Sequence, residues 1–145
     1  MQTRLDDATL DMRRKRRRAL VTRVLDAADH LPADERQLLV AIYRHGMAVS
    51  EAATMLGTPE RQLRRRVRAL VRRVCDPSFD AAVGLSPDLP RQLRQVARLT
   101  SIEGLPMRQV ALRLGISYHS VRKQCDAFRA LTQTPGLRPA AETLA

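Results

Sequence analysis

Aromatic side chains are scarce in this chain. They make up 3% of its 145 residues, and tryptophan is absent. An interior must therefore be filled by Leu, Val, Ala, Ile and Met, a set that suits helices better than sheets. Because hydrophobic residues still make up 44% of the chain, there is enough apolar material for a core. We expect an all-α fold.

Long apolar runs are also missing. The longest ones span only a few residues, far short of the roughly 20 that cross a membrane. The N-terminal residues are first acidic and then rich in arginine, which is unlike a signal peptide. These features predict a cytoplasmic, nucleoid-associated protein with no membrane partner.

Metal ligands and catalytic groups do not cluster in the sequence. Cys75 and Cys125 lie 50 positions apart, and His30, His45 and His119 are equally dispersed. This spacing excludes a disulfide framework and the usual zinc motifs, so we expect no metal and no cofactor. Cys125 falls on an apolar helical stripe, which predicts a buried, inert thiol. The chain has no nucleophile–His–acid arrangement and no phosphate-binding loop, so we expect neither an enzyme nor a small-molecule ligand.

Basic residues are the largest excess in the composition. The chain has 26 Lys and Arg against 15 Asp and Glu, a formal net charge of +11. Nearly all of these cations are arginines, whose planar guanidinium suits bidentate contacts with phosphate and guanine. A polyanionic partner is favoured, either nucleic acid or an anionic membrane surface. The alternative is a basic surface that serves only solubility, but the charges are clustered rather than scattered.

The sequence repeats itself without a gap at an offset of 58 residues. Identical residues recur as Leu31-Pro32 with Leu89-Pro90, Arg36-Gln37 with Arg94-Gln95, Gly46 with Gly104, Ala53 with Ala111, and Leu56-Gly57 with Leu114-Gly115. We predict a basic N-terminal arm or helix (1–30), a first helix-turn-helix unit (31–74), a linker (75–88), a second unit (89–132) and a disordered tail (133–145).

Each repeat has the apolar spacing of three helices. In the first repeat, a helix from Pro32 ends at Gly46, and a second, 49–56, turns Ala52, Ala53 and Leu56 inward. Gly57 permits a turn, and Thr58 caps a third helix, 59–74, with Leu63, Val67, Leu70 and Val74 on one face. In the second repeat we expect helices at 90–103 and 106–114 and one capped by Ser117, with Val121, Cys125, Phe128 and Leu131 inward. The linker has room for a short helical turn around 79–83.

Two short helices joined at a glycine, the second of them basic, form a helix-turn-helix motif. One face of the second helix packs, and the other is free to enter a major groove. Residues 61–73 contain seven arginines and no acid. Solvated helix faces usually mix charges of both signs, so this composition favours contact with nucleic acid over mere solvation.

Three segments of the first repeat resemble region 4 of bacterial sigma-70-type RNA polymerase sigma factors. They are Leu31-Pro-Ala-Asp-Glu-Arg-Gln, Arg44-His-Gly-Met and Ala52-Ala-Thr-Met-Leu-Gly. The second repeat resembles region 4 more closely still, in Ile102-Glu-Gly-Leu-Pro, Val110-Ala-Leu-Arg-Leu-Gly-Ile-Ser and Ser120-Val-Arg. The resemblance implies a winged-helix-like DNA-binding fold that reads the −35 promoter element and touches the polymerase flap. LuxR-type regulators share the pattern. No segment resembles sigma region 2, so a sigma-like regulator is predicted rather than a complete sigma factor.

Matching the motif position by position gives candidate DNA contacts at the start of each third helix. They are Thr58, Glu60, Arg61, Gln62, Arg64, Arg65 and Arg68 in the first repeat, and Ser117, Tyr118, His119, Ser120, Arg122 and Lys123 in the second. The N-terminal run Arg13, Arg14, Lys15, Arg16, Arg17 and Arg18 is a candidate phosphate-binding arm. Leu20, Val21, Val24, Leu25 and Ala28 follow it at helical spacing, which predicts a helix that packs on the first repeat.

The sequence thus predicts a sequence-specific transcription regulator that binds double-stranded DNA through two tandem units. The first repeat would supply mainly phosphate affinity, and the less basic second repeat would select bases. The alternative is an adaptor that docks on RNA polymerase or another partner, with only one unit on DNA. A fragment of a recombinase or transposase is a further alternative, with its catalytic domain elsewhere.

Overall fold

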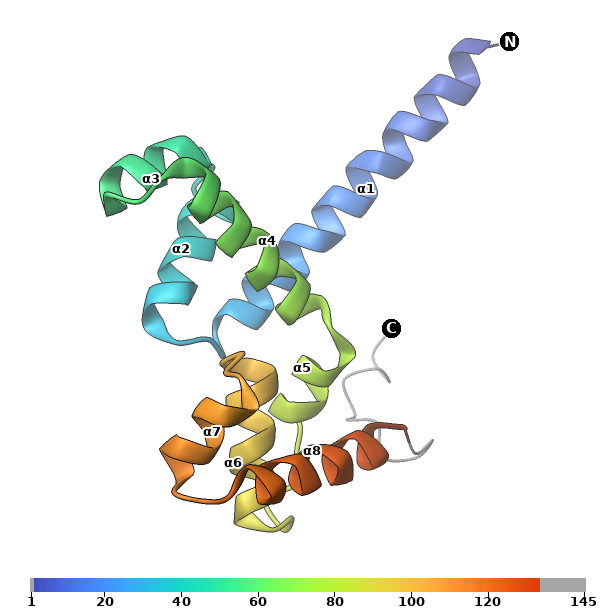
Figure 1. The fold of residues 1–145 in the computed structure, drawn as a ribbon. Helices are drawn as coiled ribbons and strands as arrows, with labels where there is room; N and C mark the ends of the chain where they lie inside the picture. Colours follow the sequence, from blue (N-terminus) through green and yellow to red (C-terminus); the bar gives the residue numbers. More distant parts are fainter. Residues whose placement is uncertain (1, 134–145) are drawn as a thin grey trace. The chain divides into compact units, whose positions relative to one another are not determined.

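The structure is a computed structural model that describes residues 2–133, with side chains from residue 6 onwards. Figure 1 shows helices joined by turns, and the described residues contain no strand, so the all-α prediction is confirmed. The predicted tail lies outside the described residues except for Gln133, where the last helix ends. The chain divides into two compact units, Met1–Val71 (unit 1) and Arg72–Ala145 (unit 2).

Unit 1 is built from α1 (Gln2–Ala28), α2 (Ala33–Tyr43), α3 (Val49–Leu56) and the larger part of α4 (Glu60–Cys75). The predicted helix 49–56 matches α3, and the predicted helix 59–74 matches α4 within one residue at each end. The core is entirely aliphatic and consists of Val24, Ala27, Ala28, Leu31, Leu38, Leu39, Ala52, Ala53, Leu63, Val67 and Leu70.

Two leucines that were predicted to pack in unit 1 are exposed. Leu20 is exposed because the packed stretch of α1 begins only at Val21, one residue further on. Leu56 is 56% exposed, since it is the last residue of α3 and lies beside the exposed turn at Gly57. Both leucines lie at the helical spacing of the buried residues, but each is at the end of the helical stretch that packs in the core, where the rest of unit 1 does not cover it.

Unit 2 contains α5 (Pro77–Val83), α6 (Arg91–Ala97), the π-helical segment η1 (Arg98–Ile102), α7 (Met107–Leu114) and α8 (Tyr118–Gln133). The single helix predicted at 90–103 is therefore divided into α6 and η1. The Thr100 hydroxyl donates to the Val96 carbonyl at 2.8 Å, which is the acceptor that the Thr100 amide would use in an α-helix. Such side-chain competition is a physical reason for the wider turn that follows.

Helix α5 lies within the segment that was predicted as a linker. Asp76 caps it by accepting a hydrogen bond from the Ser78 amide at 2.8 Å, and the hydrogen bonds from Ser78 hold the pKa of the Asp76 carboxyl below its usual range. Phe79 and Ala82 are buried on its inner face. The segment 75–88 thus contains a packed helix. The sequence had suggested only a short helical turn around 79–83, which is the second half of α5.

The backbone of unit 2 reproduces that of unit 1 at an offset of 58 residues. Helices α3 and α7 begin and end 58 positions apart, as do α4 and α8. The backbone hydrogen bonds that shape the turns recur at the same offset. The bond from Thr58 N to Ala53 O corresponds to the bond from Ile116 N to Ala111 O. Likewise, His45 N to Val40 O corresponds to Glu103 N to Arg98 O, and Met47 N to Ala41 O corresponds to Leu105 N to Leu99 O. At this offset α5 occupies the place of residues 19–25 of α1.

The turn at Gly104 is closed by an arginine. Gly104 has φ +70°, and a Cβ built on it would lie 2.0 Å from Arg73 Nη1. The same Arg73 nitrogen donates to the Glu103 carbonyl at 2.7 Å. Gly115 has a similar φ of +64°, with open space around it.

We predict that Gly104→Ala destabilises unit 2 more than Gly115→Ala does. Gly115→Ala should cost about 1–2 kcal/mol, the strain of a left-handed alanine. Gly104→Ala carries the same strain and also displaces Arg73 from a charge-assisted hydrogen bond, for a total of about 3–4 kcal/mol. Chemical unfolding of the two variants beside the parent chain measures both values, and equal losses would contradict the role given to Arg73.

Candidate nucleic-acid interface

Helix α4 has one buried face and one strongly basic face. Leu63, Val67 and Leu70 are buried in the core of unit 1. Six predicted contact residues of this helix are exposed: Glu60, Arg61, Gln62, Arg64, Arg65 and Arg68. The spacing of 61, 65 and 68 places three arginines opposite the buried leucines, because residues three and four apart share a helix face. The structure therefore brings these side chains to one open surface.

The turn before α4 is held by backbone hydrogen bonds. Gly57 is left-handed, with φ +62°, and the amide of Thr58 donates to the Ala53 carbonyl at 3.0 Å. This pattern is the Schellman ending of a helix, and it lets α4 begin at Glu60 directly after α3. Thr58 was predicted to cap α4, but its hydroxyl donates to the Leu56 carbonyl at 3.5 Å. By the 58-residue offset, Pro59 rather than Thr58 stands where Ser117 caps α8.

The seven arginines between 61 and 73 do not have one role. Arg66 donates to Asp34 on α2 at 3.0 Å, and Arg73 donates to the Glu103 carbonyl. Both lie beside the buried face of α4 and are spaced seven residues apart. Neither residue was among the candidate DNA contacts, and their helical angles relative to Leu63 and Leu70 agree with a place beside the buried face. They hold the fold, and the remaining arginines form the basic face.

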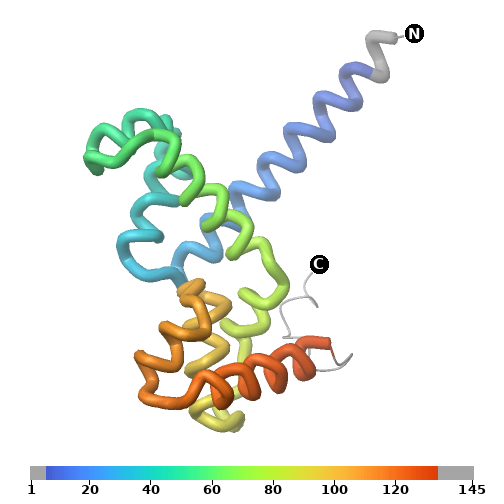
Figure 2. Tube along the Cα trace, in the orientation of Figure 1, coloured from blue at the N-terminus to red at the C-terminus, as the bar shows by residue number. Residues whose placement is uncertain are grey.

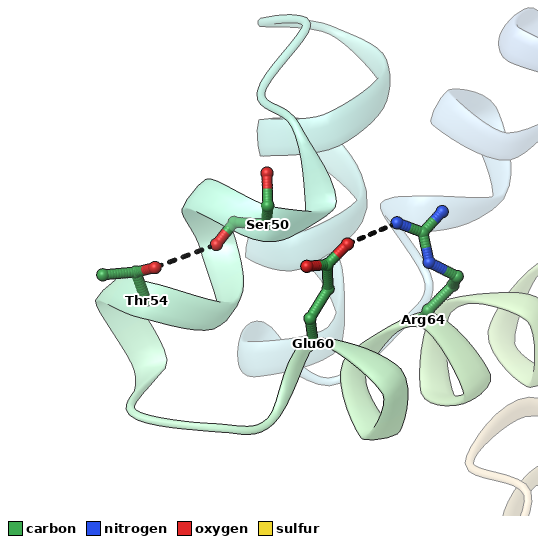
Figure 3. Close-up of polar contacts among 4 residues, drawn as sticks. All are labelled: Ser50, Thr54, Glu60 and Arg64. Atoms are coloured by element: carbon green, nitrogen blue, oxygen red, sulfur yellow. Dashed lines mark hydrogen bonds and ion pairs between the residues drawn. The ribbon is translucent and has the colours of Figure 1, made fainter.

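Arg64 is held on its own helix by an acid. Its Nη2 donates to Glu60 Oε1 at 2.6 Å, and both side chains are half-exposed (Figure 3). In the same view the Thr54 hydroxyl donates to the Ser50 carbonyl within α3, at 3.0 Å. An exposed pair four residues apart contributes only about 0.3–0.5 kcal/mol. Arg64 can therefore exchange Glu60 for a phosphate or a base at little cost.

Helix α8 offers a different surface at the equivalent positions. Tyr118, His119, Arg122 and Lys123 are exposed as predicted, whereas Ser120 is half-buried. Where α4 carries Arg61, Arg65 and Arg68, α8 carries His119, Lys123 and Asp126. The open face of α8 is thus polar with little net charge.

Ser117 caps α8 as the sequence predicted. Its Oγ accepts a hydrogen bond from the Ser120 amide at 3.1 Å and lies 2.9 Å from the Ser120 hydroxyl. The cap satisfies an amide in the first turn, where no carbonyl of the same helix is available. The side chain is exposed at the same time, so it lies at the edge of the face that carries His119.

The basic run of the N-terminal segment lies in the middle of α1. All six side chains, Arg13, Arg14, Lys15, Arg16, Arg17 and Arg18, are exposed. The predicted helix that carries and follows the run is confirmed, and Val24, Ala27 and Ala28 anchor its end in unit 1. The run is available to a polyanion along nearly two turns of helix.

The described residues hold no group of three or more His, Cys, Asp or Glu that could bind a metal ion. Cys75 and Cys125 are half-buried, so Cys125 is less enclosed than the sequence predicted. Burial and then the nearby Asp126 raise the pKa of the Cys125 thiol, which keeps it protonated and unreactive at neutral pH. Among the described residues, no helix combines the length and apolar character needed to span a membrane.

A short helix, a left-handed glycine and a basic amphipathic helix define a helix-turn-helix protein. Residues 21–73 match the family model described as "Sigma-70, region 4", so the resemblance predicted from the sequence is confirmed for this segment. Region 4 is a DNA-binding domain, so the match implies a DNA-binding, transcription-related role for this segment. No curated protein and no solved structure showed significant similarity to the chain. The matched segment begins in α1, so the last turns of that helix belong to the domain.

We predict that Ser117→Ala destabilises the chain by about 1 kcal/mol, the usual contribution of an N-cap. Ser117→Asp should preserve stability, because a carboxylate also accepts from the first-turn amides and favours the helix N-terminus. If α8 lies on DNA, the same Asp variant should bind DNA more weakly than the parent chain. Thermal unfolding and duplex binding of the two variants separate the capping role from the contact role, and an Asp variant as unstable as the Ala variant would contradict the cap.

Proposed function

We propose that the protein is a transcription regulator that binds promoter-like DNA through two helix-turn-helix units, formed around α3–α4 and α7–α8. The observation that carries the proposal is the open face of α4, where Arg61, Arg65 and Arg68 lie opposite a fully buried apolar face. A helix of this kind fits a major groove, and its arginines suit both phosphates and guanine edges.

The recurrence of the turns supports a second DNA-binding unit. The glycine turn before α8 uses the same hydrogen bond as the turn before α4, from Ile116 to Ala111. Gly115 is left-handed, with φ +64°, as Gly57 is at +62°. The two units therefore present their third helices in the same local manner. A chain with two such helices would bind two half-sites, as symmetric dimers do.

The two units would divide the work of recognition. The open face of α4 carries arginines that can neutralise several phosphates, a contribution that does not depend on sequence. The start of α8 exposes His119 and Arg122, with the half-buried Ser120 beside them, and hydrogen bonds from these side chains can distinguish base edges. Arg13–Arg18 on α1 would add phosphate contacts next to unit 1.

The salt dependence of binding tests this division. Arg65→Ala should make the plot of log K against log salt shallower by about 0.9, the value for one lost phosphate contact. Arg64→Ala should do the same, because Glu60 holds Arg64 only weakly. Arg66→Ala is the matched control: it removes the same charge from the same helix, but Arg66 lies beside the buried face of α4 and is directed at Asp34 on α2 rather than at the open face, so the slope should change much less.

In unit 2, His119→Ala should leave the slope unchanged and relax the preference for bases at one half-site. A slope that Arg64→Ala and Arg65→Ala leave unaltered would contradict the role of α4. A selectivity that His119→Ala leaves unaltered would contradict the role of α8.

A second candidate function is an adaptor that docks on RNA polymerase or another protein through unit 2. It is favoured by Leu112 on α7, which is 83% exposed, and by Tyr118 on α8, which is 48% exposed. Such apolar side chains contribute to protein interfaces more readily than to DNA contacts. Co-purification with polymerase that survives nuclease treatment and is lost in Leu112→Ser would support docking, whereas retention by Leu112→Ser would argue against this surface.

A further inference from the structure

Most of α1 lies outside the core of unit 1. The buried residues of the helix are confined to its last turns, at Val24, Ala27 and Ala28, and every residue from 6 to 20 is exposed. Figure 2 shows this part of the tube as a straight extension away from α2 and α3 of the same unit. Leu10 and Met12, which are 50% and 51% exposed, lie in the middle of the extension. This helix has apolar and charged surface with no covering element in its own unit.

The basic half of this extension repels itself. Arg13 and Arg17 are four residues apart, as are Arg14 and Arg18, and like charges at this spacing destabilise a helix. Helical segments of this length that lack tertiary packing are only marginally stable in water. A partner that brings negative charge to the basic half would therefore stabilise α1 as a helix.

The other half of the extension is acidic. Asp6, Asp7 and Asp11 precede the cationic run, and all three are exposed. Asp11 has Lys15 four residues further on and Asp7 has Arg4 three residues before it, whereas Asp6 has no cation three or four residues away in either direction. The three acids together still give this half of the extension a negative charge that cations from outside the helix can approach.

The two halves are complementary when two copies of α1 run antiparallel. Asp6–Asp7 and Arg17–Arg18 lie at equal sequence distances on either side of Met12. A two-fold axis near Met12 would therefore place the acids of each helix opposite the arginines of the other. Helical spacing puts Asp6, Asp7, Leu10, Arg14 and Arg17 on one side of α1, so the charges and Leu10 would meet in the same interface.

We infer that α1 pairs antiparallel with α1 of a second molecule of this chain, through Asp6 and Asp7 of each helix and Arg17 and Arg18 of the other. Each exposed ion pair is weak, so the association depends on four symmetric pairs together with Leu10. It is accordingly weak to moderate and sensitive to salt. The pairing does not depend on the proposed DNA-binding function, but it uses arginines that we assign to DNA, so duplex DNA and the second molecule compete for α1.

Charge-swap variants of the full chain test the pairing. Sedimentation velocity at low and high salt measures association of the parent chain, the acid-reversed variant (Asp6→Arg with Asp7→Arg) and the base-reversed variant (Arg17→Glu with Arg18→Glu). The parent chain should associate at low salt and dissociate at high salt. Each variant alone should associate at least tenfold more weakly, and an equimolar mixture of the two should recover association, because reversed acids then face reversed bases.

A matched control changes the net charge equally elsewhere. Asp29→Arg with Asp88→Arg reverses two exposed acids outside the extension and should associate as the parent chain does. Circular dichroism shows whether each variant is folded. A parent chain that stays monomeric at low salt and high concentration overturns the inference. The inference is also overturned if the equimolar mixture fails to recover association, or if either charge-swap variant alone associates as strongly as the parent chain. A control variant that dissociates would overturn it as well.

Added duplex DNA separates this inference from the proposed function. The expected result is that duplex dissociates the paired molecules. If the charge-swapped mixture recovers association but duplex leaves the parent's association intact, the pairing stands and the DNA contact of Arg13–Arg18 is contradicted. If duplex binds and the parent chain never associates, the pairing is overturned and the DNA contact stands.

Discussion

The burial of one face of α4 is the constraint on which the rest of unit 1 depends. Leu63, Val67 and Leu70 carry the hydrophobic contribution of a helix that is otherwise mostly arginine, and each fully buried aliphatic side chain contributes about 1.5–3 kcal/mol. Without that burial, the basic residues would repel each other and the helix would not persist. Because the apolar face must point inward, the charged face must point outward. The same packing that stabilises the helix therefore produces a surface suited to a polyanion.

The turns at Gly57 and Gly115 give the two units the same local backbone before their third helices. Each allows a short helix to end and a longer one to begin within a few residues, and the hydrogen bond from Thr58 to Ala53 recurs as the one from Ile116 to Ala111. The units differ in what they place on this common backbone. Arg66 pairs with Asp34 within unit 1, Arg73 closes the Gly104 turn of unit 2, and the third helix of unit 2 is much less basic than α4 and is capped by Ser117.

Much of the fold could be predicted from the sequence because apolar spacing and glycine positions are strong local signals. The helix 49–56 and the cap at Ser117 depend on residues close together in the chain, and both are confirmed. What could not be predicted depends on distant residues. Arg66 and Arg73 were not among the candidate DNA contacts, but their partners, Asp34 on α2 and the Glu103 carbonyl, lie about 30 positions away and could not be identified from the sequence. Helix α5 was expected as a linker, because proline and glycine at its ends hid the burial of Phe79.

Selection of bound DNA from a random pool by the full-length chain tests the central claim most directly. If two helix-turn-helix units read DNA, the recovered duplexes contain two half-sites at one fixed spacing, about one helical turn apart. The half-site read by α8 should be the one whose bases change when His119 is replaced. Recovered duplexes with no enriched sequence would contradict sequence-specific regulation and leave only non-specific attraction between arginines and phosphates.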